Sequence, residues 1–158
     1  MKLSEILQEK AIILDIKDLN KWALIEKMTD LLTDSGQIGQ DIRDVIHQSL
    51  VEREKSMSTG MENGIAIPHC CVNMISETVV SLGISRDGID FDSIDSGSTH
   101  LIILLVTPKN KTKMHIKTLA EIAKLLNNAG SRQRILEATT PAEVLEVIRK
   151  EEKGQVLL

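Results

Sequence analysis

The chain has 158 residues, of which 42% are hydrophobic and 27% charged, and its formal net charge is −4. These values predict one globular domain with a sizeable core rather than a disordered chain. Trp22 and Phe91 are the only aromatic residues, so the core must consist mainly of aliphatic side chains. The shortage of stacking rings and the acidic balance argue against a nucleic-acid-binding protein.

Several features predict a cytoplasmic protein without membrane insertion. The longest apolar run, around residues 101–106, is far too short to span a bilayer. The first ten residues lack the basic and apolar regions of a signal peptide. Cys70 and Cys71 are adjacent and are the only cysteines. Neighbouring cysteines rarely pair, and a reducing compartment keeps thiols free, so we expect no disulfide.

The first third of the chain is predicted to be mainly helical. Residues 3–9 suggest a short helix, and residues 11–16 a short strand or extended connector. A longer helix should begin after Asn20 as N-cap and end at Gly36, and a second should run from about 41–53. The apolar stripe of the first long helix comprises Trp22, Leu24, Ile25, Met28, Leu31 and Leu32.

The most informative stretch is residues 58–69, which ends in a histidine. Its two glycines allow backbone angles that other residues avoid. The alternation of Ile65 and Ile67 predicts a short strand with one buried face. Pro68 should end this strand, because it fixes its own φ and lacks a backbone donor. His69 is thereby held at the end of a strand on a stiff backbone, which suits either a chemically active imidazole or an ordinary loop histidine.

Two further strands are predicted after this stretch. Residues 79–84 form a β-rich run, which the sequence Arg86-Asp87-Gly88 should break as a turn. The continuously apolar run 101–106 suggests a central strand that is buried on both faces.

The last third returns to helical spacing. A helix is expected over about 113–127, with His115 one turn before Leu119 on the apolar face, and another around 132–137. The final helix should start with Thr140 as N-cap. The elements together predict one α/β domain of the α+β type over residues 3–151, followed by a frayed tail at 152–158. Its mixed central sheet should be covered by helices on both faces.

The charged run and the glycine-rich stretch together resemble a known family. Glu52-Arg53-Glu54, then Ser58-Thr59-Gly60, then Asn63-Gly64-Ile65-Ala66-Ile67-Pro68-His69, resemble the active-site block of one group of phosphotransferase system (PTS) enzyme IIA components. This is the EIIA type-2 group of fructose, mannitol and nitrogen-regulatory type. The similarity recurs, in the family's order, at residues 3–7, 89–95, 101–108 and 115–126. The opening residues and the lack of fused domains look most like the nitrogen-regulatory subtype.

The resemblance implies a role for each candidate site residue. His69 would accept a phosphoryl group on Nε2 from an HPr-like phosphocarrier, while a backbone group holds Nδ1. Arg53 would contact the phosphate through its planar fork, although alone it would be a surface charge. His115 would lie beside the phosphorylated ring, although a satisfied core histidine is the ordinary alternative. Thr59 and Gly60 are expected to add a hydroxyl and a backbone amide.

The sequence departs from the family at Cys70 and Cys71, where a small residue such as glycine and then a basic or polar residue are common. The change puts in doubt the backbone approach of the phosphoryl group. A zinc site formed with the histidines would be an alternative, but adjacent ligands make poor tetrahedral chelates. We therefore expect neither a metal nor a cofactor.

Three functions follow from these residues. The first is a regulatory EIIA protein that binds its targets according to its phosphorylation state. The second is a sugar-transport EIIA that passes the phosphoryl group to an EIIB domain. The third is a binding module whose chemistry is lost because of the Cys70 environment.

Overall fold

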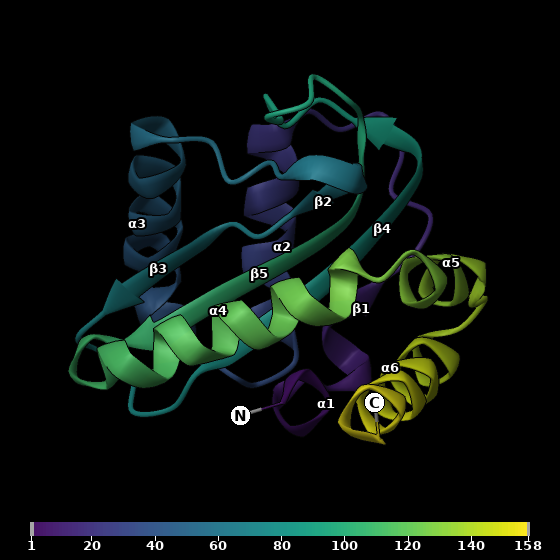
Figure 1. The fold of residues 1–158 in the computed structure, drawn as a ribbon. Coiled ribbons are helices and arrows are strands. Elements are labelled where there is room, and N and C mark those ends of the chain that lie inside the picture. The colour runs from purple at the N-terminus through teal and green to yellow at the C-terminus, as the bar shows by residue number, and fades with distance from the viewer. Residues whose placement is uncertain (1, 158) are drawn as a thin grey trace.

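The computed structural model describes residues 2–157, and a mixed five-stranded sheet lies at its centre (Figure 1). The strands are β1 (Ile12–Ile13), β2 (Ile65–Ala66), β3 (His69–Val72), β4 (Val79–Ile89) and β5 (Thr99–Pro108). The helices are α1 (Leu3–Ile6), α2 (Lys21–Asp34), α3 (Arg43–Ser56), α4 (Thr112–Asn127), α5 (Ala129–Glu137) and α6 (Pro141–Leu157). Short 3₁₀ turns occupy Glu9–Ala11, Gln40–Ile42, Glu62–Gly64 and Lys109–Lys111.

The sheet has the order β1-β4-β5-β2, and β3 also pairs with β5. Only β4 and β5 pair in antiparallel fashion, and the other pairs are parallel. Along β5, Leu101 faces Ile65 of β2 and Leu105 faces His69 of β3. β2 and β3 are therefore two halves of one edge strand, interrupted at Ile67 and Pro68.

Helices cover both faces of this sheet, as the sequence predicted. Helices α2 and α3 lie on one face, and α1, α4, α5 and α6 on the other (Figure 1). Successive residues of β5 alternate between the two cores, so Leu101 and Ile103 pack into one and Ile102 and Leu104 into the other. The prediction of a central strand buried on both faces is confirmed.

Coverage of both faces also corrects the prediction for the strand at Ile65. Ile65 and Ile67 belong to one core, but Ala66 between them is equally buried in the other core. The strand does end before Pro68, as predicted, but pairing with β5 resumes directly at His69, so His69 begins β3 rather than following the last strand of this edge. Proline is tolerated because it lies on an edge strand, where no second neighbour needs its missing N–H group.

The turn predicted at Arg86-Asp87-Gly88 is wrong. β4 continues through these residues to Ile89, and its register against β5 shifts between Ile84 and Ile89. Gly88 has a φ of 87°, which suits an irregularity within a strand rather than a chain reversal.

The apolar stripe predicted for α2 is also partly wrong. Trp22 is 39% exposed, whereas Lys21 beside it is only 5% exposed. Successive helical residues point about 100° apart, so only one of the two side chains can face the core. The ion pairs of Lys21, described below, offset the cost of burying an ammonium group.

The helix ends mostly follow their capping residues. The Asn20 side chain accepts a hydrogen bond of 2.9 Å from the Ala23 amide, and Thr140 Oγ1 accepts one of 3.1 Å from the Glu143 amide. The first helix is shorter than expected and ends at Ile6. The last helix continues to Leu157, so the backbone is helical where the sequence led us to expect a frayed tail.

Candidate functional site

A cleft of about 360 Å³ opens where β3 begins. Its lining combines the end of α3, the loop before β2 and one face of α4. The lining residues are Arg53, Thr59, Met61, Ile67, His69, Leu119, Ala120 and Ala123. Three residues predicted from the sequence to act at the site, Arg53, Thr59 and His69, thus meet in one cleft.

His69 is held through one ring nitrogen by the backbone. Its Nδ1 atom lies 2.7 Å from the carbonyl oxygen of Ile67. Because a carbonyl oxygen can only accept, Nδ1 carries the proton and donates, which leaves Nε2 with a lone pair in the neutral ring. This is the contact that the family resemblance implied for Nδ1.

The surroundings of His69 favour its neutral form. Burial lowers the pKa of the imidazole, and the charge of Arg53 lowers it further, while the contact with Ile67 and the charge of Glu54 act in the opposite direction. The net shift is downward. The nucleophilic lone pair on Nε2 therefore persists at pH values where an ordinary histidine would begin to be protonated.

His115 of α4 lies beside His69, as the resemblance implied. The ring centroids are 5.4 Å apart, and the ring planes are tilted by 50°. His115 is only 6% exposed, and its Nδ1 atom lies 2.7 Å from Thr107 Oγ1 on β5. Burial first, and then the neighbouring His69, lower its pKa. Two neutral imidazoles from different elements thus share one site.

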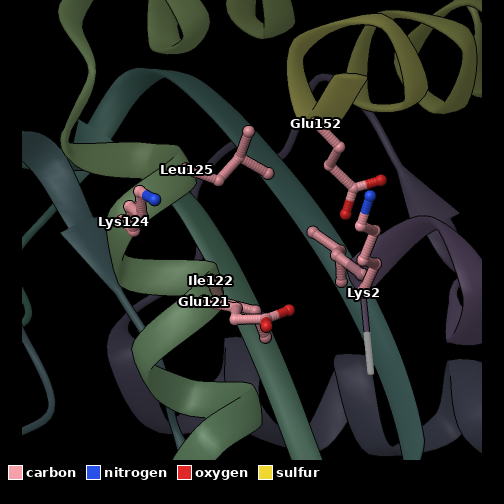
Figure 2. Close-up of a pocket in the computed structure, with 7 residues that line it drawn as sticks. Lys2, Glu121, Ile122, Lys124, Leu125 and Glu152 are labelled. Carbon is pink, nitrogen blue, oxygen red and sulfur yellow. The ribbon is translucent and has the colours of Figure 1, made fainter. Parts of the chain in front are cut away.

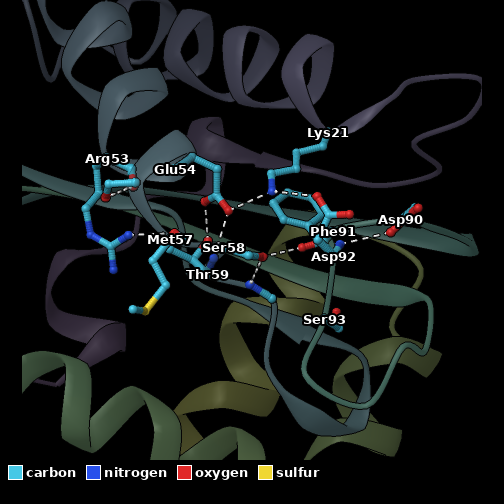
Figure 3. A network of polar contacts seen from close by, with 12 residues as sticks. Lys21, Arg53, Glu54, Met57, Ser58, Thr59, Asp90, Phe91, Asp92 and Ser93 are labelled. Atoms are coloured by element: carbon cyan, nitrogen blue, oxygen red, sulfur yellow. Dashed lines mark hydrogen bonds and ion pairs between the residues drawn. The ribbon is translucent and has the colours of Figure 1, made fainter.

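Arg53 lines the cleft at the end of α3. Its Nη1 group donates a hydrogen bond of 2.7 Å to the Met57 carbonyl oxygen, just beyond the helix (Figure 3). This contact uses one of the five N–H donors of the guanidinium group. The side chain is therefore anchored beside the cleft, close enough for its charge to lower the pKa of His69.

Thr59 and Gly60 are placed differently from the expectation. The Thr59 amide and hydroxyl donate to the two carboxylate oxygens of Glu54, at 2.7 and 2.5 Å. The Gly60 amide donates to Ser58 Oγ at 3.1 Å. The donors that we expected to face a phosphoryl group are therefore occupied within the protein, and both residues hold the loop in place.

A buried ion pair that was not predicted from the sequence lies behind this loop. Lys21 Nζ lies 3.0 Å from Glu54 Oε2 and 3.3 Å from Asp92 Oδ2 (Figure 3). Glu54 is only 2% exposed, although it belongs to a run that reads as a solvated helix end. The available signal was its spacing, because Ile46, Leu50 and Glu54 follow one another every four residues on the buried side of α3.

The two cysteines lie on opposite faces of β3. Cys70 is buried against the core of α2 and α3, and burial raises the pKa of its thiol to about 12. Cys71 is half-buried on the His69 side of the strand, because side chains alternate. Cys70 therefore cannot join His69 around one ion. Within residues 2–157, no group of three or more histidine, cysteine and acidic residues is arranged to hold a metal.

A second, smaller cavity of about 130 Å³ lies elsewhere, between α1, α4 and α6 (Figure 2). It contains none of the residues predicted to act at the site. Its lining residues are Lys2, Leu3, Glu121, Ile122, Lys124, Leu125 and Glu152.

Comparison with known proteins gives the same assignment from fold and from sequence. The crystal structure of the nitrogen regulatory protein IIA-Ntr from Neisseria meningitidis superimposes with a TM-score of 0.84, at 27% identity, over 92% of this chain and 98% of that one. The fold is therefore that of a IIA protein. The chain belongs to the family described as "Phosphoenolpyruvate-dependent sugar phosphotransferase system, EIIA 2", whose model matches residues 5–151.

Relatives of both functional types occur. A nitrogen regulatory protein of Pseudomonas aeruginosa is 28% identical over 155 residues, which are 98% of this chain and 99% of that protein. The fructose-specific EIIABC component of Bacillus subtilis is 28% identical over 153 residues. The chain spans only 24% of the length of that relative. Among the described residues, no helix is both long and apolar enough to cross a membrane.

Proposed function

We propose that this protein is a phosphoryl carrier that accepts a phosphoryl group on Nε2 of His69 from an HPr-like phosphocarrier. The observation that carries the proposal is the hydrogen bond of 2.7 Å from His69 Nδ1 to the Ile67 carbonyl. It directs the lone pair of Nε2 away from the backbone and makes the neutral ring the reactive form. In the transfer, Nε2 of His69 forms a bond to phosphorus while the bond between phosphorus and the histidine of the phosphocarrier breaks. The imidazole of the phosphocarrier keeps the electron pair of the broken bond.

Arg53 and His115 would stabilise the transferred group. The phosphoryl group brings negative charge into a protein whose formal charge is already −4. Arg53 is the cation that lines the cleft beside His69, and transfer of this kind depends on positioning and charge stabilisation. His115 holds Nδ1 toward Thr107, which leaves its Nε2 for the phosphoryl group.

The flanks of the site suit a protein partner. Met57, whose carbonyl oxygen accepts a hydrogen bond from Arg53, is 70% exposed. Ile116, next to His115, is 63% exposed. Large exposed apolar side chains around a polar centre are typical of a docking surface. The phosphocarrier and the downstream partner would use this face in turn.

We further propose a regulatory role, in which targets distinguish the phosphorylated from the unphosphorylated protein. The nitrogen regulatory relatives support it, although their full-length match does not by itself favour this role, because a fructose-specific EIIA component of Haloferax volcanii also matches over 92% of this chain and 94% of that one. The alternative is a sugar-transport EIIA that passes the group to an EIIB domain, which the name of the Bacillus subtilis relative supports. Transfer of labelled phosphate from this protein to purified EIIB domains distinguishes the two roles.

The direct test is phosphorylation in vitro with phosphoenolpyruvate, enzyme I and the phosphocarrier. We expect mass spectrometry to show one added phosphoryl group in the wild type and none in His69→Ala. A label that survives in His69→Ala would contradict the assignment of the site. Absence of label in the folded wild-type protein would leave the third function, a binding module without chemistry.

A further inference from the structure

We propose that the buried Lys21–Glu54 ion pair is a positioning device for His69, which acts through Thr59 and Ile67. Lys21 and Glu54 do not line the cleft. The expected effect on the rate of His69 phosphorylation rests on the proposed function. Figure 3 shows the first part of the connection, from Lys21 through Glu54 to Thr59.

The connection consists of one ion pair followed by hydrogen bonds. Lys21 Nζ lies 3.0 Å from Glu54 Oε2. Both Glu54 oxygens accept from Thr59, whose carbonyl oxygen in turn accepts a bond of 3.2 Å from the Ile67 amide. The Ile67 carbonyl then accepts from His69 Nδ1 at 2.7 Å. Glu54 thus holds Thr59, and Thr59 holds Ile67, the residue whose carbonyl oxygen orients the imidazole.

The interruption of the edge strand explains why this connection is needed. The amide of Ile67 bonds to the loop at Thr59, whereas the next bond to β5 is made by the Pro68 carbonyl and the Leu105 amide. Between β2 and β3, Ile67, the residue whose carbonyl oxygen holds His69, is therefore itself held through its N–H group by the loop. The loop is in turn held by Glu54.

A buried ion pair is a poor way to gain stability, because desolvation of both charges offsets most of their attraction. Such pairs are better suited to fixing one geometry. Here the carboxylate is the only common side chain that can accept from both Thr59 donors and pair with Lys21 at once. Lys21 is itself held on a second side by Asp92 and lies 5.6 Å from the Phe91 ring centroid.

The test uses Glu54→Gln and Lys21→Met, with Glu52→Gln as the matched control. A glutamine keeps the size of the side chain but replaces one acceptor oxygen with a donor, so it cannot hold both Thr59 groups. Glu52 lies on the same helix, is exposed and, among the described residues, accepts a single hydrogen bond, from Gln48 Nε2 at 3.2 Å. Lys21→Arg keeps the charge and serves as the conservative variant.

Two readouts are required. The first is the rate of His69 phosphorylation at varied phosphocarrier concentration, normalised to the folded fraction. We expect Glu54→Gln and Lys21→Met to lower kcat by about tenfold to a hundredfold, the size of effect that misorientation of a reacting group produces. KM should stay within about twofold of the wild-type value, because the docking face is unchanged. Lys21→Arg should recover most of the rate, and Glu52→Gln should behave as wild type.

The second readout is the ¹⁵N NMR spectrum of the imidazoles at about pH 8, where ordinary histidines are neutral. In the wild type we expect His69 to be the Nδ1–H tautomer. In Glu54→Gln its shifts should move toward a mixture of tautomers, while those of His115, held by Thr107, should not move. This readout needs no phosphorylation, so it tests the inference even if the proposed function fails.

The inference is overturned if folded Glu54→Gln shows a wild-type kcat together with a wild-type His69 tautomer. It is also overturned if the loss of rate merely follows the loss of folded protein. Failure of the proposed function has a different signature, which is a wild-type protein that accepts no phosphoryl group.

Discussion

His69 and His115 reach the cleft from different elements and share one electrostatic constraint. With ring centroids 5.4 Å apart, protonation of one ring raises the free energy of protonating the other. Burial acts on both rings in the same direction. In the proposed function, the incoming phosphoryl group would therefore meet two neutral imidazoles, with Arg53 as the positive charge beside them.

Arg53 is expected to promote phosphorylation of His69 through hydrogen bonds to the phosphoryl group as well as through its charge. Charge-assisted hydrogen bonds contribute about 1.5–3 kcal/mol each, so Arg53→Ala should slow phosphorylation of His69 by about one to two decades. Lys55→Ala is the control, because Lys55 is an exposed cation two residues away. Stopped-flow or quench-flow kinetics measure both. Equal transfer rates in the wild type and Arg53→Ala would show that Arg53 is an ordinary charge at the helix end, whose role is the hydrogen bond to the Met57 carbonyl oxygen.

His115 should act after the phosphoryl group has arrived. We expect His115→Ala still to accept phosphate on His69 but to pass it onward about tenfold more slowly, the value of one lost hydrogen bond to a charged group. The substitution also leaves the Thr107 hydroxyl without its partner, which should cost about 1–3 kcal/mol of stability. Thr107→Val separates the two effects, since it removes the same contact and keeps the imidazole. If onward transfer is unchanged in His115→Ala, the role of His115 is structural.

Single residues also show where sequence reasoning stops. His69, His115 and Arg53 were predicted as site residues because their types are unusual at such positions or match a motif. The occupied donors of Thr59 were not predictable in the same way. Whether a hydroxyl faces a cleft or a buried carboxylate depends on Glu54, and the burial of Glu54 depends on Lys21, which lies 33 residues earlier in the chain.

At the scale of elements, the site depends on the loop that connects α3 to β2. Gly60 in this loop forms a bridge to Ala66 of β2. A Cβ atom at position 60 would lie 2.7 Å from the Phe91 carbonyl oxygen and 2.7 Å from Ser93 Oγ. The glycine is required for close packing of the loop against the segment after β4.

Gly60→Ala is therefore expected to destabilise the protein by about 1–3 kcal/mol, the usual cost of overpacking, and to slow phosphorylation of His69. Gly154→Ala is the matched control, because position 154 lies in α6 with nothing within 4 Å of an added Cβ. There alanine should be neutral or stabilising by about 0.5–1 kcal/mol. Urea denaturation measures both values. If Gly60→Ala were as stable as the wild type, the loop would have more room than the structure shows.

For the whole molecule, the fold class was predictable because each face of the sheet leaves a pattern in the sequence. The short, continuously apolar run at Leu101–Val106 favours a strand covered on both sides, and the stripes of α2, α3 and α4 supply the covering helices. The resumption of pairing at His69, directly after Pro68, and the shift within β4 were not predictable. They depend on which neighbouring strand accepts each residue, and local spacing does not contain that information.

The two buried histidines also predict how the stability of the whole molecule depends on pH. Both have a pKa lowered below the ordinary value of about 6.5. Between the lowered pKa values and about 6.5, the unfolded chain binds more protons than the folded one, so the free energy of unfolding increases with pH in this window. Stability should therefore fall as the pH decreases from about 6.5, and the loss should level off once both rings are protonated in the folded state.

Thermal unfolding at about pH 7.5 and about pH 5.5 measures this dependence on either side of the unfolded pKa. In His69→Gln and His115→Gln the decrease in melting temperature between the two pH values should be smaller than in the wild type, and smallest in the double variant. His47→Gln on α3, where His47 Nε2 lies 3.5 Å from Glu26, controls for the loss of a histidine outside the cleft. A double variant with the same pH dependence as the wild type would show that the two rings bind protons equally well in the folded and unfolded chains. Burial would then not extend the neutral, reactive form of the two rings to lower pH than in ordinary histidines.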